Sequence, residues 1–277
     1  MSRLHLVSLL LLSGFARLVG AEPTNAAEAA AREAAAQKAA EAARIDALYQ
    51  AKKATLSPER QAWETVLEQN LGHGFYLPIH KRDFVRGTST AWDFVADDPR
   101  LPRVLLIGDS VSRGYTLPVR AALAGRANVH RAPENCGPTA NGLKKLDVWL
   151  GAGRWDAIVF NFGIHDRATP LADYTARLEQ LVARLQATGA RLVWASTTPI
   201  PDDPAKKQTA ASIVERNVAA AAVMARHGIP VADLFAAITP RLAELQNPAD
   251  VHFNAAGYAF LGREVAAAVA ARLAAPR

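Results

Sequence analysis

The stretch Gly108-Asp109-Ser110 follows an apolar run of β-formers, Arg103–Ile107, and precedes residues that can start a helix. This pattern predicts a buried parallel strand that delivers a serine to a strand-to-helix turn. The hydroxyl of Ser110 would point into the crevice where open α/β sheets bind ligands. Its backbone N–H, an orphan donor at the helix start, could hold a developing oxyanion. Asp and Ser are also ordinary helix caps, so the tripeptide alone fits either a nucleophile or a cap.

A serine nucleophile needs a base, and His252 is placed to supply one. It lies just before the last predicted helix, at the edge where the carboxyl ends of parallel strands meet. Other polar loops are expected at the same edge: residues 134–139, 161–166 and 198–207.

The elements that must position these groups begin near Leu101. The expected strands are Arg103–Ile107, Asn128–Arg131, Ala157–Phe162, Arg191–Ser196 and Ile229–Ala232. The expected helices are Val111–Leu123, Gly142–Leu150, Leu171–Thr188, Thr209–His227 and Phe253–Leu273. Repeated βα units with right-handed crossovers predict an α/β fold, a three-layer α/β/α sandwich with a central parallel sheet of about five strands.

Residues 1–21 predict a secretory signal peptide. Arg3 belongs to a short polar start, an apolar core spans Leu6–Leu12, and small residues end at Ala21, where cleavage is expected. A membrane anchor is the alternative, but the apolar run is short for a span and Arg17 interrupts it. The mature protein is therefore expected to be secreted or periplasmic, without stable membrane insertion.

Residues 22–100 predict a helical N-terminal extension in two parts. Residues 22–56 are rich in Ala, Glu, Lys and Arg and predict a solvated helical spacer. Residues 57–100 start a second helix at Ser57-Pro58 and become irregular and aromatic at 72–78. This second part is expected to pack on the core, and a wall of the cleft is the alternative role.

Composition limits the other functions. The chain has 277 residues, half of them hydrophobic, and a formal charge of +6 without a Lys/Arg cluster, so we expect no nucleic-acid partner. Cys136 is the only cysteine, which excludes an intramolecular disulfide and suggests a small buried hydrophobe rather than a nucleophile. The histidines show no metal-ligand spacing, and no phosphate loop or dinucleotide fingerprint is present in its proper setting. We therefore expect no metal and no cofactor.

Residues 101–277 resemble the SGNH, or GDSL-type, hydrolase family. Four blocks occur in the order of that family: Gly108-Asp109-Ser110, Gly137, Gly163-Ile164-His165-Asp166 and Asp250-Val251-His252. The resemblance implies a flavodoxin-like sandwich that hydrolyses esters, thioesters and sugar-bound acyl groups. It makes Ser110 the nucleophile, His252 the base and Gly137 an oxyanion-hole glycine.

The third block departs from the family by carrying His165 where an asparagine is usual. The family asparagine donates a side-chain N–H to the oxyanion, and a histidine nitrogen can also donate, with a longer reach and a titratable charge. The resemblance thus makes His165 a candidate donor. The alternative is a structural histidine, with the hole formed by the backbone N–H groups of Ser110 and Gly137.

The last block departs in its spacing. The family carboxylate lies three residues before the histidine, where this chain has Ala249, whereas Asp250 lies two residues before His252. Residues i and i+3 meet across a helical turn and residues i and i+2 do not. Asp250 can orient His252 if the loop is not helical. Otherwise a backbone carbonyl does so, leaving a Ser–His dyad.

These features predict a secreted serine esterase that acts on an O-acyl ester of a small molecule or glycan, with acetylated carbohydrates favoured. Asp109 and Asp166 are expected to be structural. Arg113 and Arg167 could meet an anionic substrate, but surface solvation is favoured for both. The alternative from another class is a carbohydrate-binding or scaffold protein that has lost hydrolysis, which the two departures permit.

Overall fold

The computed structural model describes residues 25–206 and 208–275, so the predicted signal peptide, 1–21, lies outside the described residues. The chain divides into two compact units, residues 1–44 and 45–277. Helix α1, Asn25–Ala54, crosses this division. Its side chains up to Arg44 are exposed, as expected for a solvated spacer, but Tyr49 is fully buried within the second unit. The spacer prediction is therefore wrong for the last turns of α1.

A five-stranded parallel sheet forms the centre of the second unit, in the order β2-β1-β3-β4-β5. The strands are β1 Arg103–Ile107, β2 Asn128–Arg131, β3 Ala157–Phe160, β4 Arg191–Ala195 and β5 Val231–Ala232. This order is that of flavodoxin-like folds and confirms the predicted fold class. β3 ends before the predicted Phe162, because its pairing with β1 and β4 stops at Phe160. β5 starts later than the predicted Ile229, because its pairing with β4 begins at Val231.

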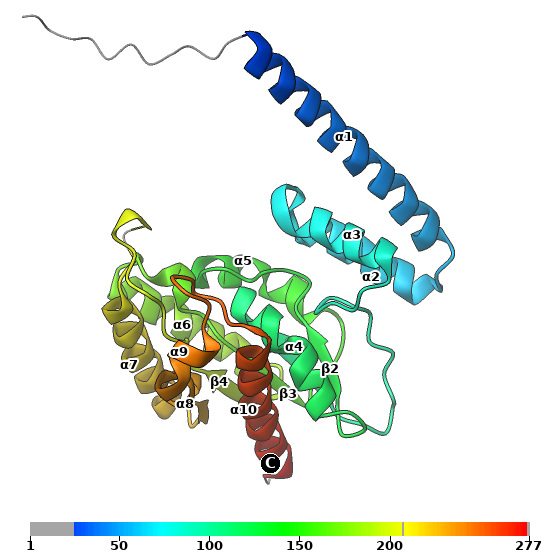
Figure 1. Cartoon of the computed structure of the whole chain (residues 1–277). Coiled ribbons are helices and arrows are strands. Elements are labelled where there is room, and N and C mark those ends of the chain that lie inside the picture. The colour runs from blue at the N-terminus through cyan, green and yellow to red at the C-terminus, as the bar shows by residue number, and fades with distance from the viewer. Residues whose placement is uncertain (1–24, 207, 276–277) are drawn as a thin grey trace, which may run out of the picture. The chain divides into compact units, whose positions relative to one another are not determined.

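Helices cover both faces of this sheet. They are α4 Ser110–Ala122, α5 Thr139–Leu150, α6 Leu171–Gln186, α7 Ala210–Arg226, α8 Leu234–Ile238, α9 Leu242–Leu245 and α10 Ala255–Ala274. Because side chains alternate along a strand, Leu106 of β1 packs with α4 and α10, while Leu105 packs with α5, α6 and α7. Figure 1 shows α4 and α10 side by side on the first of these faces. None of the helices in the described ranges is long and apolar enough to cross a membrane.

The segment before the sheet is helical rather than irregular. Helix α2, Pro58–Asn70, is followed by a π-helical turn, η1, Gly72–Tyr76, and by helix α3, Leu77–Arg86. The prediction of an irregular stretch at 72–78 is wrong, because Gly72 changes the chain direction with a positive φ of 76° and Pro78 fits the first turn of α3.

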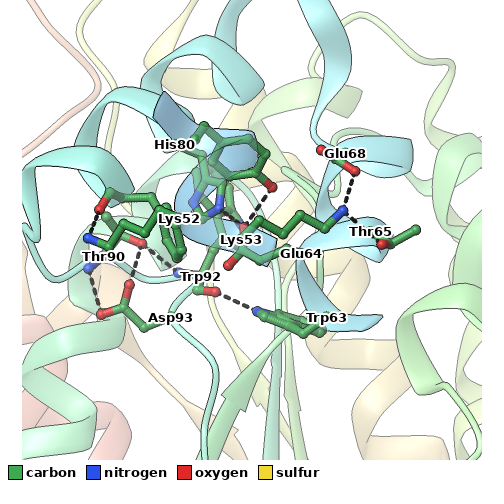
Figure 2. Close-up of polar contacts among 12 residues, drawn as sticks. Lys52, Lys53, Trp63, Glu64, Thr65, Glu68, His80, Thr90, Trp92 and Asp93 are labelled. Atoms are coloured by element: carbon green, nitrogen blue, oxygen red, sulfur yellow. Dashed lines mark hydrogen bonds and ion pairs between the residues drawn. The ribbon is translucent and has the colours of Figure 1, made fainter. Parts of the chain in front are cut away.

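A buried polar cluster holds the extension together. The Glu64 carboxylate, only 3% exposed, lies 2.7 Å from His80 Nε2 and accepts a 2.8 Å hydrogen bond from the Tyr49 hydroxyl. Figure 2 shows His80 of α3 facing Glu64 of α2. Because a buried carboxylate is costly without partners, the cluster ties the end of α1 to α2 and α3.

Hydrogen bonds also join the extension to the sheet domain. The Arg120 guanidinium of α4 donates to the carbonyls of Thr90 and Ala91, each at 3.1 Å. Trp92 Nε1 donates to the Ala132 carbonyl, and the Trp92 carbonyl accepts a 2.7 Å bond from Trp63 Nε1, as Figure 2 shows. The segment 57–100 is therefore hydrogen-bonded to the sheet domain.

Candidate active site

Ser110 stands at the start of α4, directly after β1 and one tight turn. Asp109 caps the helix, its carboxylate accepting a 2.9 Å hydrogen bond from the Val111 N–H. A side chain at Gly108 would approach Ser112 Oγ to 2.7 Å, so this position requires glycine. The strand–turn–helix prediction for Ser110 and the structural role of Asp109 are both confirmed.

A buried cation lies behind this turn. The Arg131 guanidinium at the end of β2 is 2% exposed and donates to the carbonyls of Gly108, at 3.1 Å, and Asp109, at 2.9 Å, and to Ser112 Oγ, at 2.5 Å. Three bonds from one rigid guanidinium fix the backbone that carries Ser110. No motif in the sequence assigns Arg131 to the site, although a charged residue ending a buried strand is an unusual feature.

The structure brings Ser110, His252 and Asp250 together in one hydrogen-bonded chain. Ser110 Oγ lies 2.8 Å from His252 Nε2, and His252 Nδ1 lies 2.8 Å from Asp250 Oδ1. This is the geometry of a nucleophile, a base and an orienting carboxylate. The His252 and Asp250 side chains are 35% and 45% exposed, so the site is open to solvent on their side.

A non-helical loop allows Asp250 to reach His252 across two residues. Ala249 adopts a positive φ of 52°, and the Asn247 N–H donates to the His252 carbonyl at 3.0 Å. Asp250 Oδ1 also accepts a 3.3 Å hydrogen bond from the His252 backbone N–H. Desolvation acts to raise the pKa of Asp250, but the hydrogen bonds and charge of His252 outweigh it and hold that pKa below its ordinary value.

Two backbone donors are available beside Ser110. Neither the Ser110 N–H nor the Gly137 N–H donates to a protein acceptor among the described residues. Gly137 has a positive φ of 68°, a conformation that favours glycine, and it follows Cys136, whose N–H donates to the Gly108 carbonyl at 3.1 Å. Such unpaired donors at a helix start and a loop are suited to an oxyanion.

The side chain of His165 is exposed in the short 3₁₀ turn η2, Ile164–Asp166. It forms no hydrogen bond with Ser110 or with any other residue in the described part of the chain. The turn itself is held by Asp166, which is fully buried and accepts hydrogen bonds from the Thr139 N–H, at 2.8 Å, and hydroxyl, at 2.7 Å. The structural role predicted for Asp166 is confirmed.

Tyr76, the last residue of η1, brings the extension against α4. Its ring centroid lies 5.5 Å from that of Trp92 and 5.6 Å from the guanidinium carbon of Arg113. Burial raises the pKa of the Tyr76 phenol, and the positive charge of Arg113 opposes the rise. The sequence indicated only an aromatic stretch near Gly72, and nothing local predicted that Tyr76 would reach Arg113 of α4.

The remaining candidate residues differ in their outcomes. Arg113 is not simply solvated at the surface: its buried Nε has no partner among the described residues, and its guanidinium also lies 5.8 Å from the Trp92 ring. Arg167 is half-buried and donates to the Ile164 carbonyl. Cys136 is fully buried, as predicted, and burial raises the pKa of its thiol to about 12. The described residues include no cluster of His, Cys, Asp and Glu that could hold a metal ion.

Comparisons with known proteins identify the fold and the family. The solved lipase/acylhydrolase from Enterococcus faecalis is 24% identical with a TM-score of 0.56, covering 64% of this chain and 100% of its own. Axe2, an acetylxylan esterase from Geobacillus stearothermophilus, is 16% identical with a TM-score of 0.53, covering 64% of this chain and 97% of its own. At these identities the TM-scores show a common fold alone. No curated protein matches the sequence. The sequence model of the GDSL-like lipase/acylhydrolase family matches residues 106–260, more than half of the chain, and the protein belongs to that family.

Proposed function

We propose that this acylhydrolase is a serine esterase that cleaves O-acyl esters through an acyl-enzyme. The observation that carries the proposal is the contact of 2.8 Å between Ser110 Oγ and His252 Nε2, at the start of a helix with unpaired backbone donors. Asp250 completes the triad through its 2.8 Å bond to His252 Nδ1. We assign no cofactor or metal to the reaction.

In the proposed mechanism, His252 removes the proton from Ser110 as Oγ attacks the ester carbonyl. The carbonyl π electrons move to oxygen, and the N–H groups of Ser110 and Gly137 hold the oxyanion, with His165 as the third donor. His252 then returns the proton to the leaving alcohol. Water, activated by His252, cleaves the acyl-enzyme and restores Ser110.

Acetylated carbohydrate is the proposed substrate class. Its support is the acetylxylan esterase activity of Axe2, whose fold this chain shares, together with the secreted location that residues 1–21 predict. A panel of p-nitrophenyl esters from acetate to octanoate, with acetylated xylan and acetylated monosaccharides, tests this class. A preference for acyl chains longer than acetyl would contradict it.

Covalent labelling tests the nucleophile. A fluorophosphonate should label the purified protein at Ser110, and Ser110→Ala should abolish both the labelling and ester hydrolysis. Ser112→Ala is the matched control, because Ser112 lies on the same turn but is buried and hydrogen-bonded to the Asp109 carbonyl and to Arg131. Failure of the wild type to label would favour the alternative of a binding or scaffold protein without hydrolysis.

Secretion is a separate proposal. Cleavage after Ala21 would place the mature protein outside the cytoplasm, in the periplasm or the medium. N-terminal sequencing of the protein from its native host checks this, and a cytoplasmic protein that retains Met1 would overturn it.

A further inference from the structure

Two carbonyl groups control the backbone donors beside Ser110. The Asp109 carbonyl belongs to the same planar peptide unit as the Ser110 N–H, so whatever holds this carbonyl also fixes the direction of that N–H. The Gly108 carbonyl accepts a 3.1 Å hydrogen bond from the N–H of Cys136, the residue directly before Gly137. Both proposed oxyanion donors are therefore linked to the carbonyls of Gly108 and Asp109.

One side chain holds both carbonyls from behind. Arg131 Nη2 donates to the Gly108 carbonyl at 3.1 Å and to the Asp109 carbonyl at 2.9 Å. Arg131 Nη1 donates to Ser112 Oγ at 2.5 Å, and Ser112 Oγ donates to the Asp109 carbonyl at 2.8 Å. A carbonyl that accepts from a charged donor is more strongly polarised, and the N–H of the same peptide becomes a stronger donor.

The charge of this guanidinium is kept from water. Arg131 is 2% exposed, and the ring of Trp92, from the extension, lies 5.8 Å from its guanidinium carbon. In the described part of the chain its acceptors are three uncharged oxygens, and the nearby Asp109 carboxylate is bonded to the Val111 N–H instead. Because the interior has a low dielectric, the charge acts strongly on the peptide dipoles that it contacts.

We propose that Arg131 is a positioning residue for the oxyanion hole: it orients and polarises the Asp109–Ser110 peptide so that the Ser110 N–H points at the oxyanion formed from the ester carbonyl. Arg131 contacts no substrate and transfers no proton. Its effect is greatest in the transition state, when the carbonyl oxygen becomes negative. This inference rests on the proposed esterase function.

Arg131→Met in the full chain tests it, because methionine fills the buried site with an apolar side chain and removes the charge and the N–H donors. Complete loss of one oxyanion donor lowers kcat by about 10²- to 10³-fold, so a misoriented donor should cost roughly 10- to 100-fold. We expect this fall in kcat for p-nitrophenyl acetate, with KM nearly unchanged. The rate of fluorophosphonate labelling should fall with it, because the phosphoryl oxygen occupies the same hole. Arg131→Lys, which keeps the charge without the planar fork, should lose less.

Arg120→Met is the matched control. The Arg120 guanidinium is also partly buried, and it donates to backbone carbonyls outside the turn at 108–110, those of Val129, Thr90, Ala91 and Asp93. Both methionine variants should lower the melting temperature, because both leave buried carbonyls without a donor. Only Arg131→Met should slow catalysis at temperatures where both variants are folded.

The outcomes separate this inference from the proposed function. An equal kcat for Arg131→Met and Arg120→Met, or a loss confined to KM, would overturn the inference while the esterase function stands. If Arg131→Met does not fold, Arg131→Lys decides, and a wild-type kcat and labelling rate for that variant overturn the inference. A wild-type protein that fluorophosphonate does not label at Ser110 would overturn both.

Discussion

The Asp250 carboxylate accepts two hydrogen bonds from His252, one from ring Nδ1 at 2.8 Å and one from the backbone N–H at 3.3 Å. One oxygen atom therefore fixes both the ring and the main chain of the proposed base. A helical i, i+3 pair would require the carboxylate one residue earlier, at Ala249. In this non-helical loop, Asp250 orients His252 from two residues before it. It also keeps the proton on Nδ1, so that Nε2 is free to accept from Ser110.

Asp250→Asn should lower kcat and leave KM nearly unchanged. The amide cannot stabilise the imidazolium, and it can favour the wrong His252 tautomer. The same change in a buried triad costs about 10⁴-fold, and we expect roughly 10²- to 10³-fold here because Asp250 is 45% exposed and screened by water. Steady-state kinetics checks this, with Asp173→Asn, whose side chain is exposed on α6, as the control. Unchanged turnover would mean that another group orients His252.

The same pair should contribute to stability in a pH-dependent way. Because His252 holds the pKa of Asp250 below its ordinary value of about 3.9, the contribution is present above that value and is lost as pH falls through the lowered pKa. For a half-exposed pair we expect less than about 1 kcal/mol. Urea unfolding of wild type and Asp250→Asn should differ at pH 7 and converge in acid. A constant difference would show that the ionised carboxylate adds no stability.

Ala249→Gly should make the protein slightly more stable and keep it active. Ala249 is the one non-glycine residue with a positive φ in the described ranges, and this conformation costs an L-residue about 1–2 kcal/mol. The greater chain entropy of glycine offsets about 0.5–1 kcal/mol of the gain. Denaturant melts check the net increase, with Ala222→Gly in α7 as a control that should destabilise by about 0.5–1 kcal/mol. Equal losses in both variants would show that φ at Ala249 carries no strain.

His165→Ala should lower turnover with little effect on substrate binding, because a donor to the oxyanion acts mainly in the transition state. Loss of one such donor costs at most about 2.7–4 kcal/mol. His165→Asn should recover part of the rate and flatten any titration that the imidazole adds to the pH profile. A fully active His165→Ala enzyme with an unchanged pH profile would assign His165 to the surface and the oxyanion to backbone donors.

Cys136 should be inert in the folded enzyme. Burial raises the pKa of its thiol to about 12, so almost no thiolate forms at neutral pH. Ellman's reagent should react with Cys136 only after unfolding in guanidinium chloride. Cys136→Ala should retain esterase activity. Rapid reaction of the native thiol would place Cys136 in an accessible position and contradict its burial.

Sequence patterns predicted those parts of the protein that depend on local chemistry. The apolar runs and the βα alternation predicted the five strands, and Gly108-Asp109-Ser110 predicted the turn before α4. They did not predict where β3 ends, which depends on its pairing with β1, or how Asp250 reaches His252, which depends on φ of Ala249. The position of Tyr76 depends on how the extension docks through Trp92, a long-range relationship that no short motif records.

The buried carboxylate of Asp166 joins two segments that are far apart in the sequence. It fixes the first residue of α5, Thr139, two residues after Gly137, and it sits beside His165 in the neighbouring turn. A thermal displacement of either loop must therefore carry the other with it. The separation between Gly137 and His165 is therefore set through one buried carboxylate.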